Sequence, residues 1–308
     1  MAHPSETVLV TGATGFTGRY LVDHLRGAGY VVVGTTCQPE DADPNLGILH
    51  ADLNDEASLR ALVEAVRPGA VIHLAAISFV PYADALNIYR VNVLGTENLL
   101  RTLDASRLEL RKLIIASSSN VYGSPDVSPI SETVCPRPVS HYACSKLAME
   151  HMAALYADRF STIITRPFNY TGPGQSVSFF VPKLVAAFRR HERVLELGDL
   201  DVVRDISDVR AVTVCYRALL ESDASGVTVN LCTGQGVHLT EVFEALVEIA
   251  GYRPEVRVKE GFLRSNDIRR LVGCPGRLHA LIGEPPAYAL RDILLNMYRT
   301  GDSREFLR

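Results

Sequence analysis

The chain has 308 residues, with 31 Lys and Arg against 35 Asp and Glu, so its formal net charge is −4 and its isoelectric point is about 6.1. This charge balance excludes a basic nucleic-acid-binding protein, and we expect no nucleic-acid partner. With 47% hydrophobic and 21% charged residues, the composition is that of a globular protein rather than a disordered one. The length allows a large hydrophobic core in one or two domains.

Six cysteines are spread over the chain without the two-residue spacing of a zinc ribbon or a thiol oxidoreductase. They are Cys37, Cys135, Cys144, Cys215, Cys232 and Cys274. The N-terminal residues lack the positive and apolar regions of a signal peptide, and no run reaches the roughly 18 apolar residues of a membrane span. We therefore expect a reduced, cytoplasmic protein with no metal and no membrane partner.

In the first half of the chain, short apolar runs alternate with segments of helical period, as in a parallel sheet covered by helices on both faces. The predicted strands are residues 7–11, 30–35, 47–52, 70–74, 113–117 and 163–166. Helices are predicted after the first strand and at residues 55–66, 83–105 and 140–160. Right-handed crossovers would assemble these elements into a Rossmann-like, doubly wound parallel sheet of the α/β class.

The pattern changes after Arg166, where proline and glycine crowd residues 167–182, as in a functional loop or a domain boundary. Beyond it, helices are predicted at residues 184–190, 208–221, 240–250, with Thr240 as the cap, and 287–299, and a strand at 227–231. That strand indicates one return to the large sheet. We therefore predict a dinucleotide-binding domain over residues 1–168 plus about 205–230, and a smaller, discontinuous C-terminal α/β substrate domain over about 169–204 plus 231–308.

A glycine-rich turn follows the first predicted strand, with Gly12, Gly15 and Gly18 at spacings of three. In such a turn Gly12 allows a tight bend, Gly15 lets backbone N–H groups approach a pyrophosphate, and Gly18 lets the helix pack on the strand. A plain strand-to-helix turn is the alternative. The position between a first strand and a first helix favours a dinucleotide cofactor at the helix N-terminus.

The end of the second predicted strand bears on the choice between NAD and NADP. Thr36, Cys37 and Gln38 include no acidic side chain of the kind that binds the ribose hydroxyl of NAD, and no arginine for the phosphate of NADP. We therefore prefer NADP(H), with NAD(H) possible. Asp52 and Leu53, after the third strand, are placed to meet the adenine, although Asp52 could also cap the helix that follows.

A candidate proton donor lies in the predicted helix of residues 140–160. Tyr142 and Lys146 are four residues apart, so both side chains lie on one helix face. A phenol with a pKa near 10 is a poor acid until a nearby cation and a nicotinamide ribose lower its pKa. We expect Lys146 to be that cation, and Ser118 to hold a substrate carbonyl while Tyr142 protonates its oxygen.

These features resemble the extended short-chain dehydrogenase/reductase family of NAD-dependent epimerases and dehydratases, whose members act on nucleotide sugars. The resemblance covers nearly the whole chain. It rests on the glycine turn, His73-Leu74-Ala75-Ala76, Asn92 before Val93-Leu94-Gly95-Thr96, Ser118 ahead of Val121-Tyr122-Gly123, and Tyr142 with Lys146. The C-terminal half is most similar to the GDP-4-keto-6-deoxy-mannose reductase branch and, more distantly, to GDP-mannose 4,6-dehydratases, through residues 166–175, 197–205 and 264–268.

The resemblance implies a role for each of two residue sets. The dinucleotide would contact Gly12, Gly15, Phe16, Thr17, Gly18, Thr36, Asp52, Leu53, Leu74, Ala75, Ala76, Asn92, Tyr142 and Lys146. The sugar nucleotide would contact Ser118, Asn120, Asn169, Gln175, Lys183, Arg204, Arg264 and Asp267. Among these, Arg204 and Arg264 would clamp the diphosphate, because planar guanidinium groups form paired hydrogen bonds with phosphate.

The resemblance also narrows the reaction on the sugar. Dehydratases of the family place a glutamate base, and epimerase-reductases of the fucose-synthase type a cysteine, where this chain has Asn120, and an amide cannot act as a base. The latter enzymes also place a histidine after a Gly-Pro pair, where this chain has Gly174. Reduction of the 4-keto group of a GDP-linked 4-keto-6-deoxy sugar with NADPH remains, giving a GDP-6-deoxyhexose of the rhamnose or 6-deoxytalose type. Tyr170-Thr171 and His141 depart from the usual reductase pattern, so the sugar or its configuration can differ.

Two other functions stay open from the sequence. A nucleotide-sugar 4-epimerase would share the Ser-Tyr-Lys set, but it would hold NAD tightly and would need no added nicotinamide. A non-catalytic NADP-sensing protein would keep the fold for regulation and would not depend on Tyr142. The resemblance further suggests a homodimer through the two long helices that start near Ala83 and Ser140.

Overall fold

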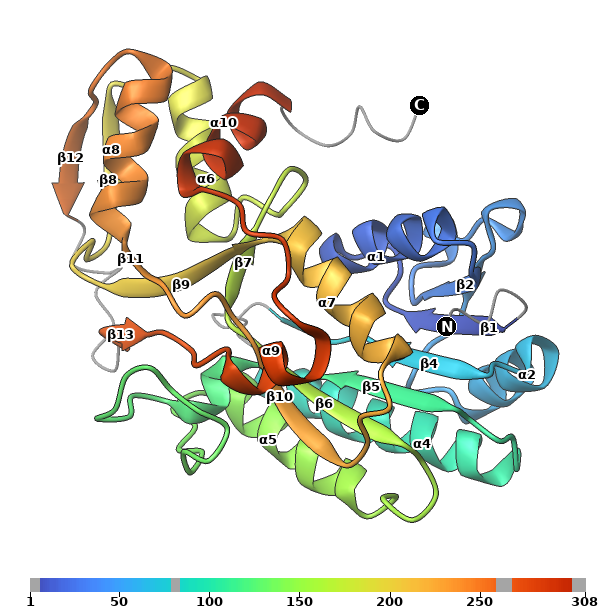
Figure 1. The fold of residues 1–308 in the computed structure, drawn as a ribbon. Helices are drawn as coiled ribbons and strands as arrows, with labels where there is room; N and C mark the ends of the chain where they lie inside the picture. The colour runs from blue at the N-terminus through green and yellow to red at the C-terminus, as the bar shows by residue number, and fades with distance from the viewer. Residues whose placement is uncertain (1–5, 79–83, 259–267, 301–308) are drawn as a thin grey trace.

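The computed structural model describes residues 6–78, 84–258 and 268–300 (Figure 1). Its large sheet has seven strands in the order β10-β6-β5-β4-β1-β2-β3, and every neighbouring pair is parallel. The strands are β1 (Thr7–Thr11), β2 (Val31–Thr36), β3 (Ile48–His50), β4 (Ala70–His73), β5 (Lys112–Ala116), β6 (Thr162–Pro167) and β10 (Val227–Leu231). The order reverses at β1, as in a doubly wound fold, so the predicted Rossmann-like sheet is confirmed.

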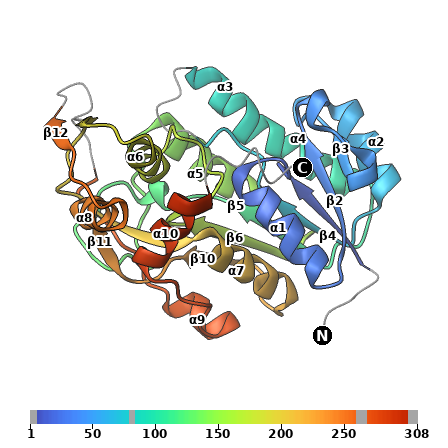
Figure 2. The same ribbon diagram turned by 90° about the horizontal axis from the view of Figure 1, so that it is seen from above.

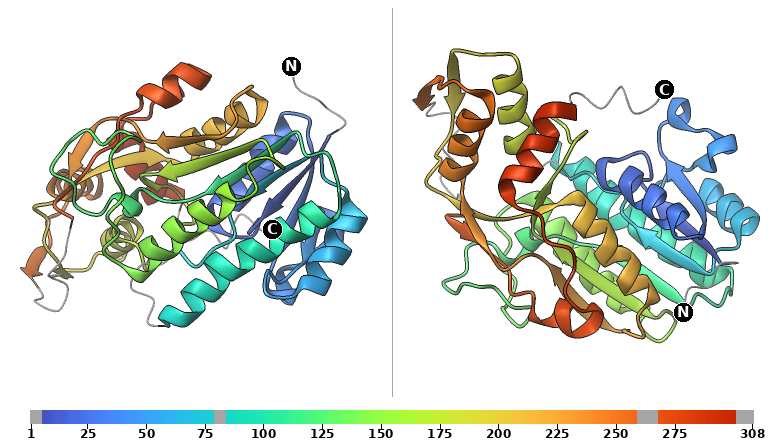
Figure 3. Two further views of the ribbon diagram at one scale, coloured as in Figure 1. Left: turned by 90° about the horizontal axis from the view of Figure 1, so that it is seen from below. Right: turned by 45° about the horizontal axis from the view of Figure 1, so that its top comes forward.

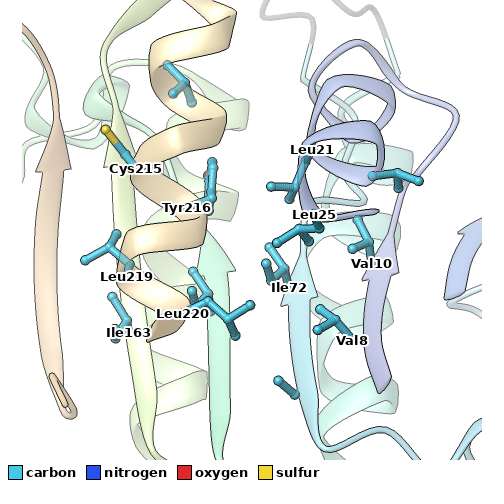
Figure 4. Packing of buried hydrophobic residues seen from close by; sticks show 14 of the residues in the cluster. Val8, Val10, Leu21, Leu25, Ile72, Ile163, Cys215, Tyr216, Leu219 and Leu220 are labelled. Atoms are coloured by element: carbon cyan, nitrogen blue, oxygen red, sulfur yellow. The ribbon is translucent and has the colours of Figure 1, made fainter. Parts of the chain in front are cut away.

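Helices cover both faces of this sheet (Figure 2). They are α1 (Phe16–Gly27) and α7 (Val209–Glu221) on one face, and α2 (Glu56–Val66), α4 (Gly95–Ala105) and α5 (His141–Ala154) on the other. Side chains alternate along β1, because successive residues of a strand point to opposite faces. Val8 and Val10 therefore pack with Leu21 and Leu25 of α1 (Figure 4), whereas Leu9 joins the core beneath α2, α4 and α5.

A smaller lobe with its own core lies beside the C-terminal ends of the large sheet's strands (Figure 3). Its strands are β7 (Asn169–Thr171), β9 (Val203–Asp208), β11 (Gly236–His238) and β13 (Arg270–Leu271), with β8 (Val194–Leu197) paired to β12 (Glu255–Val258). Its helices are α6 (Phe180–Arg189), α8 (Leu239–Ala250) and α10 (Leu290–Thr300), while α9 (Gly276–Ile282) packs near β10 and α7. Between the two parts of the lobe, the chain returns to the large sheet through α7 and β10.

Several predicted boundaries differ from the structure. The helix expected at residues 83–105 is divided into α3 (Ala85–Tyr89), the π-helix η3 (Arg90–Leu94) and α4, and its first residue, Ala83, lies outside the described residues. The helix expected to reach residue 160 ends at Ala154, where the backbone tightens into i→i−3 hydrogen bonds. The prediction that Thr240 caps α8 was wrong, since His238 occupies the cap and Glu241 accepts a hydrogen bond from its N–H.

No helix in the described part of the chain is long and apolar enough to span a membrane.

Candidate active site

A cavity of about 840 Å³ lies between the C-terminal ends of the large sheet's strands and the smaller lobe. Ligands of open α/β sheets bind at this edge. The cavity brings together fifteen of the residues expected from the sequence. They are Gly12, Gly15, Phe16, Thr17, Gly18, Leu74, Ala75, Ala76, Ser118, Asn120, Tyr142, Lys146, Asn169, Gln175 and Arg204.

The glycine turn forms one wall of this cavity. Gly12 has a φ of +70°, and a Cβ atom on it would lie 2.9 Å from the backbone of Ala75. A Cβ atom on Gly18 would collide with the carbonyl oxygen of Gly12. Gly15 is the N-cap of α1, and no described side chain caps this helix. The first N–H groups of α1 are therefore available to an anion, so the turn fits a dinucleotide pyrophosphate.

A buried chain of hydrogen bonds begins at Thr11, next to the glycine turn, and runs through His73 to Thr96. Thr96 Oγ1 donates to the carbonyl of Asn92 (2.8 Å), so it accepts from His73 Nε2 (2.9 Å). His73 Nδ1 is then an acceptor and receives the hydroxyl of Thr11 (2.7 Å), whose oxygen accepts from the N–H of Ala75 (3.2 Å). Burial lowers the pKa of His73 to about 3, so the ring is neutral and keeps this tautomer.

Asn92 extends the same chain toward the catalytic helix. Its amide accepts from the N–H of Ile77 (2.8 Å) and donates to the carbonyl of Ile77 (3.1 Å) and to Ser145 Oγ (3.0 Å). Ser145 Oγ in turn donates to the carbonyl of Tyr142 (2.7 Å). Asn92 is fully buried and lies in the π-helix η3, where it positions the segment at Ile77 and the first turn of α5.

The three expected catalytic residues meet at the edge between β5 and α5. Ser118 follows β5 and accepts a hydrogen bond from the N–H of Asn120 (3.2 Å). Ser140 caps α5 by accepting from the N–H of Ala143 (3.2 Å), which places Tyr142 and Lys146 in the first two turns of the helix. Both side chains are at most 6% exposed, and both line the cavity together with Ser118.

The charge states of this pair suit proton donation. Burial raises the pKa of the Tyr142 phenol to about 12, a hydrogen bond with Ser118 opposes this shift, and Tyr170 adds to it. Within the protein chain, burial outweighs the polar contacts. The lowering of this pKa that the sequence predicts depends on a nicotinamide ribose as well as on Lys146, and it stays a prediction. Lys146 donates to the carbonyl of Ala116 (2.7 Å). Tyr142 is thus fully protonated at neutral pH, as a proton donor must be.

Lys146 is supported by a buried ion pair. Burial lowers the pKa of Lys146 to about 8, and the Glu150 carboxylate opposes this shift. Glu150 is held by Arg166 through two hydrogen bonds of 2.9 and 2.6 Å, and by the hydroxyl of Ser117. Arg166 Nη1 also donates to the hydroxyl of Tyr122 (3.0 Å). Both members of the ion pair are less than 10% exposed, so each charge depends on the other.

The ionisable side chains that line the cavity are few. Among the described residues, the lining holds the cations Lys146 and Arg204 and three tyrosines, but no aspartate, glutamate, histidine or cysteine. Arg204 donates to the carbonyl of Val203 (3.0 Å) from one guanidinium nitrogen. Such a cavity favours an anionic ligand and offers no carboxylate base.

Five expected residues that the structure describes are not among those that line the cavity: Thr36, Asp52, Leu53, Asn92 and Lys183. Arg264 and Asp267 lie outside the described residues. Thr36 Oγ1 accepts from Thr14 Oγ1 (3.1 Å) and the N–H of Gln38 (3.2 Å). Asp52 accepts from the N–H of Asn54 (2.9 Å), while the cap of α2 is Asp55. Leu53 is buried in the core beneath α4.

The structure also brings residues to the cavity that the sequence analysis did not assign to a site. Tyr170, Phe180 and Tyr216 come from β7, α6 and α7. Tyr170 lies in residues 166–175, which carry the family resemblance, so the sequence could have indicated that it lies at the site. Tyr216 carries no such signal, because only the packing of α7 on the sheet brings its hydroxyl within 3.0 Å of Thr165 Oγ1.

Comparison with known proteins identifies the family. Residues 8–232 match the NAD dependent epimerase/dehydratase family. The chain belongs to this family. It is 35% identical to the GDP-6-deoxy-D-talose 4-dehydrogenase of Aggregatibacter actinomycetemcomitans, over 95% of this chain and 97% of the relative. It is 32% identical to the GDP-6-deoxy-D-mannose reductase of Pseudomonas aeruginosa, over 97% of this chain and 98% of the relative.

Solved structures of similar proteins share the whole fold. The structure of RMD from Pseudomonas aeruginosa complexed with NADPH is 32% identical, with a TM-score of 0.84 over 96% of this chain and 98% of that chain. A Burkholderia cenocepacia protein described as a candidate epimerase is 43% identical, with a TM-score of 0.89 over 96% and 98%. UDP-glucose 4-epimerase of Thermotoga maritima is 26% identical, with a TM-score of 0.88 over 98% and 100%.

Family membership confirms the resemblance seen in the glycine turn and the Tyr142–Lys146 pair. The protein is an NAD(P)-dependent enzyme of the epimerase/dehydratase family, whose members include nucleotide-sugar oxidoreductases and epimerases.

Proposed function

We propose that the protein reduces the 4-keto group of a GDP-4-keto-6-deoxyhexose with NADPH and forms a GDP-6-deoxyhexose of the rhamnose or 6-deoxytalose type. The observation that carries this proposal is the composition of the cavity. Its described lining combines Ser118, Tyr142 and Lys146 with no carboxylate, histidine or cysteine side chain. That set can transfer one proton to a ketone oxygen, but it has no base for removing a proton from sugar carbon.

The chemistry follows from the positions of these side chains. A bound nicotinamide supplies the hydride that adds to the carbonyl carbon. Ser118 donates a hydrogen bond to the ketone oxygen, and Tyr142 transfers its phenolic proton to that oxygen as the alcohol forms. Lys146 stabilises the phenolate left on Tyr142, because an ammonium group favours a nearby negative charge. Glu150 keeps Lys146 charged by raising its pKa against the effect of burial.

Asn120 supports reduction over dehydration. It lies in the turn after β5 and lines the cavity beside Ser118. An amide donates and accepts hydrogen bonds but does not take up a proton at neutral pH. We therefore assign Asn120 to substrate binding, as a ligand of the sugar hydroxyls.

The substrate-binding half of the site is assigned from charge and position. Arg204, Asn169 and Gln175 line the cavity from the smaller lobe, and a guanidinium group suits a diphosphate. We propose that these residues, with Lys183, Arg264 and Asp267, hold the nucleoside diphosphate. The dinucleotide then belongs to residues 1–168 plus about 205–230, and the sugar nucleotide to about 169–204 plus 231–308.

The preference for NADPH rests on the end of β2. Thr36, Cys37 and Gln38 present no carboxylate that would repel a 2′-phosphate, and the similar RMD structure contains NADPH. We propose NADP(H) as the preferred cofactor, with NAD(H) as the weaker one.

One alternative is supported by a specific observation. The fold is similar to UDP-glucose 4-epimerases, and an epimerase would use the same Ser118, Tyr142 and Lys146 in both directions. Such an enzyme retains NAD through both half-reactions, so it would turn over without added nicotinamide.

Substrate specificity is tested by mixing the protein with NADPH and the 4-keto-6-deoxyhexoses linked to guanosine, uridine and thymidine diphosphates. We expect NADPH consumption with kcat/KM at least about tenfold higher for the guanosine compound, since lost polar contacts to the base cost at least this much. NMR of the product assigns the configuration at carbon 4. Equal rates with all three nucleotides would contradict the guanosine assignment. Epimerisation by protein that retains NAD during purification would contradict the reductase.

We also propose a homodimer through the two long helical segments, which are α3, η3 and α4 for the first and α5 for the second. Both segments expose large apolar side chains at or next to them, since Leu86 and Leu155 are each 82% exposed and Leu94 is 59% exposed. Light scattering during size exclusion should give twice the chain mass of 33.7 kDa. Changing Leu94 and Leu155 to lysine should give the monomer mass, and an unchanged mass would place the interface elsewhere.

A further inference from the structure

Tyr170 lines the cavity but has no part in the proposed reaction. It begins the smaller lobe on β7 and lines the cavity together with Tyr142. Its hydroxyl lies 2.7 Å from Thr17 Oγ1, across 153 residues of sequence. Burial raises the pKa of Tyr170, so the phenol is neutral, and its hydroxyl is engaged by a residue of the cofactor turn.

Further contacts join the same two segments. The rings of Phe16 and Tyr170 are stacked, with centroids 6.0 Å apart and an interplanar angle of 12°. Arg19 Nη2 donates to the carbonyl of Gly174 (3.1 Å), and the hydroxyl of Tyr20 donates to the carbonyl of Pro173 (2.8 Å). The first two turns of α1 are therefore attached to residues 170–174 at four points.

Each segment carries residues for a different ligand. Thr17 belongs to the first turn of α1, where the N–H groups suit a pyrophosphate. On the other side, Gln175 donates to the carbonyl of Tyr170 (3.1 Å) and lines the cavity beside Asn169. A shift of α1 on binding the dinucleotide would thus move Asn169 and Gln175 through a contact that involves both ligand sites.

We infer that Tyr170 is a positioning residue whose hydrogen bond to Thr17 couples the dinucleotide site to the sugar-nucleotide site, so that either ligand strengthens binding of the other. This inference rests on the proposed function for the identity of the two ligands. Coupling between two sites is reciprocal, and typical values are about 5- to 150-fold in affinity. The Thr17–Tyr170 contact joins the two binding segments directly, so its loss should reduce the coupling more than either separate affinity.

The test uses calorimetric titration of the full chain with NADP⁺, alone and with saturating GDP, which cannot react. For the unchanged protein we expect GDP to tighten NADP⁺ binding by about fivefold or more, and NADP⁺ to tighten GDP binding by the same factor. In Thr17→Val and in Tyr170→Phe this factor should be clearly smaller than in the unchanged protein, although the stacking at Phe16 and the contacts of Arg19 and Tyr20 remain. The double variant should lose no more than either single variant, because both remove the same hydrogen bond.

Two matched variants serve as controls. Thr102→Val removes a hydroxyl that donates to the carbonyl of Asn98 in α4, and Tyr252→Phe removes one that donates to the carbonyl of Phe188. Both should keep the coupling of the unchanged protein. Thr17→Val preserves side-chain shape, so it gives the result even where Tyr170→Phe folds poorly.

The outcomes separate this inference from the proposed function. If NADP⁺ and GDP both bind but their coupling is absent, persists in Thr17→Val, or falls equally in the controls, the inference is overturned while the function stands. If the protein binds neither NADP⁺ nor GDP, both are overturned.

Discussion

Replacing Tyr142 by phenylalanine is expected to slow ketone reduction by about 10²- to 10⁴-fold, the usual contribution of a positioned proton donor. The phenol is buried, lines the cavity and is protonated at neutral pH, since burial raises its pKa to about 12. Phenylalanine keeps the ring and loses only the acidic hydroxyl. The affinity for NADP⁺ should therefore stay within about twofold of the unchanged protein, because the glycine turn is untouched.

Single-turnover loss of NADPH with the GDP-4-keto sugar measures this step directly. Tyr252→Phe is the matched control, since it removes a phenolic hydroxyl in the smaller lobe that donates to a backbone carbonyl. Its rate should equal that of the unchanged protein. A Tyr142→Phe variant with nearly full reduction rate would mean that another group supplies the proton, and the roles of Ser118 and Lys146 would have to be reassigned.

The change Glu150→Gln is expected to lower the free energy of unfolding by about 3–5 kcal/mol, the usual cost of removing one partner from a buried ion pair. Arg166 is 7% exposed and would keep its charge, since a guanidinium group stays protonated in proteins. Its bidentate partner would then be a neutral amide, which leaves the buried charge uncompensated. Urea unfolding measures the difference. Glu244→Gln, in an exposed pair with Arg253, should leave stability unchanged. Equal losses in the free energy of unfolding for the two variants would show that the buried ion pair stabilises the fold no more than the exposed one does.

The same variant should also change the pH dependence of reduction. Lys146 has a pKa of about 8, lowered by burial and raised by Glu150. Its ammonium form, which stabilises the phenolate of Tyr142, is therefore present below about pH 8 and lost above it. Without the Glu150 carboxylate, the pKa of Lys146 falls further, so the decline in hydride-transfer rate should begin at a lower pH. A decline at the same pH in both proteins would show that deprotonation of Lys146 does not cause the loss of rate at high pH.

Local sequence patterns were sufficient to predict those parts of the site that a single chain segment forms. Gly12, Gly15 and Gly18 lie between a strand and the start of a helix, and each meets the close backbone contact that its lack of a side chain permits. Tyr142 and Lys146 share a face of α5 because residues four apart on a helix are neighbours. The alternation of apolar strands and helices likewise predicted the parallel sheet, since its period reflects burial on both faces.

Other features depend on residues that are far apart in the sequence. The surroundings of Asn92 are one example, because its side-chain amide hydrogen-bonds with Ile77 and with Ser145. Its expected contact with the cofactor stays a prediction. Burial of Tyr142 is another such feature: it raises the pKa of the phenol, and it follows from the packing of whole elements rather than from the spacing of one helix. The lowered pKa expected from the sequence depends also on a nicotinamide ribose and stays a prediction.

From its sequence alone, this protein's fold class, its glycine turn and the Tyr142–Lys146 pair were determined, because backbone geometry and helix period act over a few residues. Only the tertiary structure decided that Glu150 and Arg166 form a buried ion pair behind Lys146, and that Thr17 bonds Tyr170. The ion pair joins α5 to β6 of the large sheet. The hydrogen bond joins α1 to β7 and so requires the smaller lobe to dock. Their energies depend on burial and on distances between elements, which no local pattern specifies.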